Sequence, residues 1–327
     1  MPATSRLPGR AAITLATTKT VYLEMAFTLA RSFMVWNRDS GIGFHIITDL
    51  EAELPADLKD VKLVRIPSGA LGKGFSPKLH LDTLAPAQHT LFIDADCLCI
   101  GPLNPIFDRF AGRAVAVAGG KISTGLWWSN VDDVCRRIGV ASLPKFNGGI
   151  YYVEPGALAT KVYERAREVA PLYDEWHLVR LRGHANDEIL MAIAMAESGL
   201  EAVSDEDSVM APFNLYPQFL ELDVFAGRCA ICNPPPPHRL SRPDLPMRTV
   251  RPVLPHFVND YTDHWRYRSE ALKLGLVGKG MPLGLARILA FFTIVVPGIT
   301  VEVGKVKLRP AFRKIFGVRA IRLTKRV

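Results

Sequence analysis

Hydrophobic and polar positions follow two periods in the first two-thirds of the chain. Short, fully apolar runs bounded by turn residues are typical of buried strands. Longer stretches with an apolar residue at every third or fourth position predict amphipathic helices. The predicted strands cover 11–17, 44–48, 61–66, 90–93, 114–118 and 149–153, and the predicted helices cover 22–36, 78–84, 156–169 and 187–198.

These elements alternate between strand and helix over the first 110 residues. Strands that are apolar on both faces must be covered on both faces, as in parallel sheets flanked by helices. We therefore expect an α/β fold with a mixed, mostly parallel sheet. Open sheets of this kind bind ligands at the carboxyl ends of their strands.

The segment 201–255 shows neither period and contains four consecutive prolines at 234–237. Proline lacks a backbone donor and fixes its own φ angle. The pattern predicts a rigid, irregular excursion on the surface, not a linker between independent domains.

Composition narrows the class of protein. The 327 residues are 49% hydrophobic and 22% charged, which excludes collagen, a coiled coil and wholesale disorder. The five cysteines do not form a disulfide framework, and Cys229-x-x-Cys232 lacks the second pair of a zinc site, so two half-buried thiols are expected. The first ten residues lack the apolar core of a signal peptide, which favours a cytoplasmic protein.

The net charge of +8 is divided unevenly along the chain. Residues 1–270 carry a net charge of −3, and residues 271–327 carry +11. We take 1–270 as the catalytic domain and 271–327 as a basic helical extension. The apolar run 288–301 has 14 residues and Pro297-Gly298 is expected to interrupt it, so a membrane span is not expected.

Beyond this run, basic and apolar residues mix from 305 to 326. Such segments rest on anionic membranes, so we expect peripheral attachment to the inner face of the cell membrane. A terminal helix packed on the core is the alternative. Nucleic acid is not expected, because no stacking or groove-reading motif accompanies the charge.

Two carboxylates stand directly after the buried strand at 90–93, in the sequence Asp94-Ala95-Asp96. Where the chain leaves the strand, it can curl so that both side chains face one pocket. Mg²⁺ and Mn²⁺ bind carboxylate oxygens together with substrate phosphates. The pattern therefore favours a metal site over a solvated turn.

The run from 91 to 107, LFIDADCLCIGPLNPIF, resembles the metal-binding region of family 8 glycosyltransferases, which include glycogenin and lipopolysaccharide galactosyltransferases. The resemblance extends over 11–268. It implies a GT-A (Rossmann-like) fold, a UDP-sugar donor, Mn²⁺ (or Mg²⁺) as cofactor and a retaining reaction. The acceptor would be a glycan or lipid-linked glycan.

Further motifs follow in the order of the family. The resemblance implies that Thr17, Thr18 and Tyr22 face the nucleotide. It places Lys78 at the nucleotide sugar. Thr17 and Thr18 could instead cap the helix that follows. A single lysine on a helix, such as Lys78, is also typical of an ordinary solvent-exposed position.

The segment Asn147-Gly148-Gly149 resembles the family's sugar-binding loop. Glycine lets a ligand approach the backbone closely, and asparagine offers a donor and an acceptor to hydroxyl groups. The family's polar pair near the anomeric carbon corresponds either to Asn186 with Asp187 or to Asp187 with Glu188.

The last motif contains His256 and Trp265. The resemblance implies that His256 is the third metal ligand beside Asp94 and Asp96, and that Trp265 lies at the substrate. The family's phosphate-binding lysine is absent, and Arg266 is our candidate to replace it. A nucleotidyltransferase, or a non-catalytic protein that binds sugar nucleotides or serves as a membrane-bound partner, remains the alternative.

Overall fold

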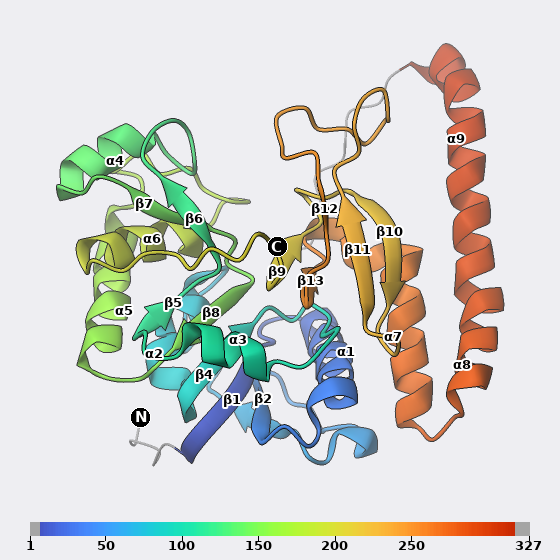
Figure 1. The fold of residues 1–327 in the computed structure, drawn as a ribbon, viewed down its shortest axis with the longest axis horizontal. Helices are drawn as coiled ribbons and strands as arrows, with labels where there is room; N and C mark the ends of the chain where they lie inside the picture. The colour runs from blue at the N-terminus through green and yellow to red at the C-terminus, as the bar shows by residue number, and fades with distance from the viewer. Residues whose placement is uncertain (1–6, 318–327) are drawn as a thin grey trace.

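The computed structural model describes residues 7–317. The last ten residues of the predicted basic tail, 318–327, lie outside this range. A six-stranded sheet forms the centre of the fold, in the order β3-β2-β1-β4-β8-β5 (Figure 1). Its strands are β1 (Leu7–Leu15), β2 (Ile42–Thr48), β3 (Lys62–Arg65), β4 (Ala87–Ile93), β5 (Val115–Ala116) and β8 (Ile150–Val153).

Strands β1 to β4 pair in parallel, whereas β8 pairs antiparallel with β4 and with β5. Leu91 and Ile93 of β4 join the core that contains α1 (Thr20–Asn37) and α3 (Asn104–Phe110). Phe92 joins the opposite core, which contains α4 (Val131–Ile138), α5 (Ala157–Val169) and α6 (Asp187–Glu197). Burial on both faces explains the continuous apolar strands, and the expected mixed α/β fold is confirmed.

Smaller elements complete this part of the fold. The predicted helix at 78–84 is a 3₁₀ turn, η2 (Ser76–His80), followed by the short α2 (Leu81–Leu84). Strands β6 (Gly119–Ile122) and β7 (Leu143–Phe146) pair antiparallel with each other. Two more 3₁₀ turns, η1 (Ala56–Leu58) and η3 (Ala170–Leu172), lie in connections.

The segment 201–255 was predicted to be irregular, and this prediction was wrong for the short strands that it contains, although most of its residues lie outside strands. It contains β9 (Met210–Pro212), β10 (Gln218–Asp223), β11 (Arg228–Cys232), β12 (Thr249–Val250) and most of β13 (Leu254–His256). β10, β11 and β12 form one sheet, and β9 pairs with β13. Such short strands give too few positions for a period to show, and the four prolines lie between β11 and β12. The two thiols of the Cys-x-x-Cys pair are free and buried on β11.

Two helices follow η4 (Asn259–Asp263). The first, α7 (Trp265–Gly278), crosses the predicted boundary at residue 270. The second is a long helix that runs beside α7, made of α8 (Leu283–Ala290), the π turn η5 (Phe291–Val295) and α9 (Val296–Phe316) (Figure 1).

The expected break at Pro297-Gly298 is wrong, because the helix continues through both residues. A π turn ends two residues before Pro297, so the regular hydrogen-bond ladder is already altered where the proline lacks its donor. By length and composition alone, the 29-residue stretch Leu283–Ala311 is able to cross a membrane. Of the residues in its most apolar 18-residue segment, 11% are buried against the rest of the protein.

Candidate active site

The carboxylate pair begins where β4 ends. The Asp94 amide donates to the Gly149 carbonyl at 2.9 Å, and the Cys97 amide donates back to the Asp94 carbonyl at 3.0 Å. This turn brings Asp94 and Asp96 to the wall of one cavity of about 370 Å³. The predicted curl after the strand is therefore present.

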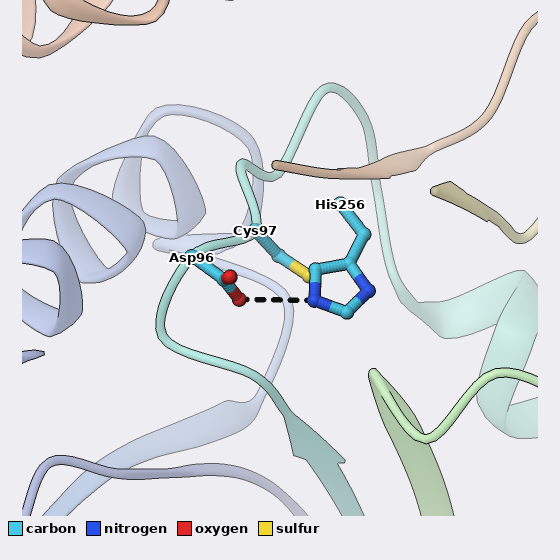
Figure 2. A group of neighbouring side chains, drawn as sticks. All are labelled: Asp96, Cys97 and His256. Atoms are coloured by element: carbon cyan, nitrogen blue, oxygen red, sulfur yellow. Dashed lines mark ion pairs between the residues drawn. The ribbon is translucent and has the colours of Figure 1, made fainter. Parts of the chain in front are cut away.

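His256 reaches this pair from the end of β13. Its backbone forms a bridge with Cys97, and the Phe257 amide donates to the Asp96 carbonyl at 2.9 Å. His256 Nε2 consequently lies 3.0 Å from Asp96 Oδ1 and 3.6 Å from Asp94 Oδ2. Figure 2 shows the imidazole turned toward the Asp96 carboxylate.

Asn147 fixes the orientation of this imidazole. Its Oδ1 accepts from the Gly149 amide at 3.1 Å and lies 2.8 Å from His256 Nδ1. Because that oxygen only accepts, Nδ1 carries a proton, and the lone pair of Nε2 in the neutral ring faces two carboxylates. Such an arrangement calls for a proton or a cation between these groups. The residues therefore fit a divalent metal ion, with Asn147 orienting the histidine from behind.

The ligand atoms that lie within 4.8 Å of one another belong to Asp96, Cys97 and His256 (Figure 2). This group differs from the predicted set of Asp94, Asp96 and His256. Burial and the nearby Asp96 and Asp94 charges raise the pKa of the Cys97 thiol well above its usual value, so the sulfur stays protonated. A hard cation prefers the carboxylate oxygens to such a thiol.

Lys78 explains why Asp94 stands slightly apart. Its ammonium lies 2.7 Å from Asp94 Oδ2, 2.8 Å from the Gly148 carbonyl and 3.9 Å from Asp187 Oδ2. Burial lowers the pKa of Lys78, but the charges of Asp187 and Asp94 outweigh it, so the net shift is upward and the side chain stays charged. The predicted basic residue is therefore at the site, where it holds Asp94 and the glycine loop together.

Gly148 and Gly149 allow other groups to come close to the backbone, but in this structure those groups are side chains of the protein. A Cβ at Gly149 would lie 2.5 Å from His256 Nδ1, and a Cβ at Gly148 would lie 2.6 Å from Asp187 Oδ2. Asp187 is 2% exposed and accepts from the Tyr151 hydroxyl at 2.6 Å. In this structure the predicted sugar-binding loop positions the histidine and the aspartate.

All three residues of the ambiguous pair lie at the start of α6. Asn186 caps the helix by accepting from the Glu188 amide at 2.9 Å. Glu188 accepts from the Gly148 amide at 2.9 Å and from the Trp128 indole at 2.7 Å. Asp187 and Glu188 therefore face the glycine loop, whereas Asn186 has a structural role. Burial and the Asp187 charge raise the pKa of Glu188 to about 7, against the two hydrogen bonds.

The cavity wall contains the predicted nucleotide-facing residues and a group of cations that the sequence analysis missed. Thr17, Thr18 and Tyr22 line the cavity. Lys73, Arg182 and His184 line another part, together with Lys19 and Lys78. A Cβ at Gly74 would lie 2.5 Å from His184, so the glycine-rich loop 72–75 packs against the loop that precedes α6. The Gly-Lys-Gly sequence at 72–74 was the available signal.

Trp265 and Arg266 are not among the described residues that line the cavity, and their contact with the substrate stays a prediction. The Trp265 indole donates to Glu302 of α9 at 3.1 Å. The Arg266 guanidinium lies 4.6 Å from the centroid of the Trp265 ring. The C-terminal helix therefore contacts the body through Trp265, and its packing on the core is the alternative that the sequence left open.

Comparison with known proteins supports the fold. The galactosyltransferase LgtC, solved in complex with donor and acceptor sugar analogues, is similar with a TM-score of 0.53 and 13% identity, over 83% of this chain and 96% of that one. Mouse xyloside xylosyltransferase 1 has a TM-score of 0.40 and 12% identity, over 63% and 88%. GlyE of Streptococcus pneumoniae TIGR4 has a TM-score of 0.39 and 14% identity, over 61% and 46%.

No family model and no curated protein matches the sequence. The likeness to LgtC shows that the chain has the GT-A glycosyltransferase fold, as predicted. Membership of family 8 in particular stays a prediction.

Proposed function

We propose that this chain is a metal-dependent glycosyltransferase. It moves a hexosyl group from a UDP-sugar to a hydroxyl of a glycan or lipid-linked glycan, with retention of configuration. One observation carries the proposal: on a GT-A fold, Asp94 and Asp96 converge with His256 and open into a cavity lined by cations.

The charges of this cavity favour a ligand with several negative charges. The lining includes four Lys and Arg side chains but only the two carboxylates of Asp94 and Asp96. A divalent cation on those carboxylates would leave the wall strongly positive, and a diphosphate would balance it. Thr17 and Tyr22 offer a hydroxyl and an aromatic ring to the nucleoside. The choice of uridine follows the family resemblance, as does retention.

In this proposal Asp94, Asp96 and His256 hold Mn²⁺ or Mg²⁺. The bound cation supplies Lewis acidity to the departing diphosphate. Lys78 keeps Asp94 in place and adds positive charge beside it. Asp187 and Glu188, fixed against the glycine loop, face the donor sugar.

The test is release of UDP from a panel of UDP-sugars, with Mn²⁺ or Mg²⁺ and with or without glycan acceptors. We expect turnover with at least one donor and its loss in Asp96→Asn, because the negative charge that faces His256 and would hold the cation is removed. Asp133→Asn is the matched control, since this carboxylate is exposed on α4. Binding of no UDP-sugar by the metal-loaded wild type would contradict the proposal.

The same experiment separates the two alternatives. A nucleotidyltransferase would release pyrophosphate from UTP and a sugar phosphate instead of UDP. A non-catalytic binding protein would bind the sugar nucleotide without releasing UDP with any acceptor.

We further propose that the long C-terminal helix rests on an anionic lipid surface, on the inner face of the cell membrane. On one side, Ala286 and Ala290 are buried against the body, and Glu302 contacts Trp265 and Arg239. Twelve large apolar side chains of the helix are at least 40% exposed: Leu285, Ile288, Leu289, Phe291, Phe292, Val296, Ile299, Val301, Val303, Val306, Leu308 and Ile315.

The geometry of docking favours a helix that lies in the membrane plane. Contacts with the body extend from Ala286 to Glu302, about 24 Å along the axis at 1.5 Å per residue. The rest of the protein is packed along the side of this helix. If the docked helix crossed the bilayer, the polar surface of the protein would have to enter the lipid with it, so the docked helix cannot span the membrane. The cations Lys305, Lys307, Arg309 and Lys314 suit anionic headgroups.

A further inference from the structure

Arg182 occupies an unusual place at the mouth of the cavity. It lies in the loop before α6, is exposed, and lines the same cavity as Asp94 and Asp96. Its backbone is left-handed, with φ 53°, a conformation that costs a residue with a Cβ on the order of 1 kcal/mol. The fold keeps this conformation, which places a guanidinium at the cavity.

The contact that holds this guanidinium does not neutralise it. Arg182 Nη2 donates to Oδ1 of Asn259, which is three residues after His256 and also has a left-handed backbone, with φ 60°. An amide oxygen is neutral, so the contact orients the cation and leaves its charge available. The segment that follows the histidine is thereby tied to the loop that precedes Asp187.

The neighbouring Arg180 shows the contrast. Two of its nitrogens donate to the Asp174 carboxylate at 2.8 and 2.7 Å. This pair lowers the pKa of Asp174, and Arg180 is not among the described residues that line the cavity. Two arginines in one loop therefore differ in role: one is paired with a carboxylate at the surface and the other is aimed at the cavity.

The sequence after His256 contains no lysine or arginine before Arg266, and the Arg266 guanidinium packs on Trp265, whose indole donates to Glu302 of the C-terminal helix. We propose that Arg182 binds a phosphoryl oxygen of the donor's diphosphate, and that Asn259 positions it for this contact. A guanidinium offers a planar fork of donors that matches phosphate. This inference rests on the proposed function, because it assumes a nucleoside diphosphate in the cavity.

The test is calorimetric titration of UDP and of uridine in Mn²⁺, with Arg182→Ala, Arg182→Lys and Arg180→Ala. We expect Arg182→Ala to weaken UDP binding about 10- to 100-fold, the loss of one or two charge-assisted hydrogen bonds. Uridine binding should not change. Arg182→Lys should recover only part of the loss, and Asn259→Ala should weaken UDP binding less than Arg182→Ala. Thermal unfolding without ligand checks that each variant folds.

The outcomes separate the two proposals. If the wild type binds UDP and Arg182→Ala binds it as tightly as Arg180→Ala does, the inference about Arg182 is wrong and the proposed function stands. Equal losses for UDP and uridine would also overturn it, because the effect would not come from phosphate. If the metal-loaded wild type binds no UDP, the inference and the proposed function both fail.

Discussion

The carboxyl group of Glu188 lies in an environment that disfavours its ionised form. Burial, followed by the charge of the adjacent Asp187, raises its pKa from 4.5 to about 7. The Gly148 amide and the Trp128 indole oppose this shift by donating to the two oxygens. The fold therefore keeps an acid beside the glycine loop that titrates near neutral pH.

Glu188→Gln should change how stability depends on pH. Between pH 4.5 and about 7 the folded wild type retains a proton that the unfolded chain has released, so its unfolding free energy falls as pH rises. The glutamine variant lacks this slope. Its amide nitrogen cannot accept from Trp128, so it should be about 1 kcal/mol less stable than the wild type near pH 5. The difference should shrink or reverse near pH 8.

Denaturant unfolding at several pH values measures both curves. Glu197→Gln is the control, because this side chain lies at the far end of the same helix in a surface pair with Arg165. A constant difference between wild type and Glu188→Gln across this range would show that Glu188 does not titrate there.

Single residues were predicted best where local sequence determines their place. Asp94 and Asp96 follow a strand whose end could be read directly, and Lys78 lies at the start of a helix-like motif. Asn147 was assigned to a sugar, but its oxygen is used by His256, which is 109 positions away. Arg182 showed no signal, because its partner Asn259 and its left-handed backbone appear only in the folded chain.

At the scale of elements, the site is a junction between β4, β8 and β13. β4 and β8 were predicted from their apolar runs, with their ends within three residues. β13 has only three residues, pairs with the equally short β9, and contains a proline, so no period could reveal it. The resemblance therefore pointed to His256, but neither it nor the pattern predicted the strand that carries this residue.

Gly149 sets how closely β8 and β13 approach each other. In Gly149→Ala, the added methyl group would lie 2.5 Å from His256 Nδ1 and 3.1 Å from Asn147 Oδ1. We expect a loss of about 1–3 kcal/mol in unfolding free energy, because buried atoms must move apart. His256 should be displaced from Asp96, so Mn²⁺ binding should weaken more than stability alone explains.

Gly120→Ala is the matched control, since a Cβ at this position of β6 meets nothing within 4 Å. Thermal unfolding and titration with Mn²⁺ measure the two effects. If Gly149→Ala bound Mn²⁺ as the wild type does, His256 would not be a metal ligand, or the loop would move without disturbing it.

At the scale of the whole molecule, charge and apolar surface are concentrated at the C-terminus. The difference in net charge between residues 1–270 and 271–327 was evident from the sequence, because it requires only a count of charged residues. The length of the helix was not, since the helix continues through Pro297 after a π turn that composition does not predict. The exposed apolar side lies opposite the docked side, so the same helix is able to contact the body and a lipid surface together.

Replacing Ile288 and Phe292 by serine should detach the protein from anionic vesicles. These side chains are 57% and 66% exposed. Burying each apolar side chain contributes about 1.5–3 kcal/mol, so losing both should reduce partitioning by at least about 100-fold. Flotation with vesicles of phosphatidylglycerol and phosphatidylcholine measures this. High salt should weaken wild-type binding, because the cations of α9 meet anionic headgroups.

Val179→Ser is the control, because Val179 is 55% exposed on the body and should not affect flotation. If the wild type failed to float, or if the double variant floated equally well, the helix would not rest on lipid. Concentration-dependent dimers in sedimentation, abolished by the two serines and without vesicle binding, would assign the apolar side to a second copy of the chain. Binding to anionic vesicles that both salt and the serines reduce requires the charge and the apolar side to act together, which neither a packed helix nor a dimer predicts.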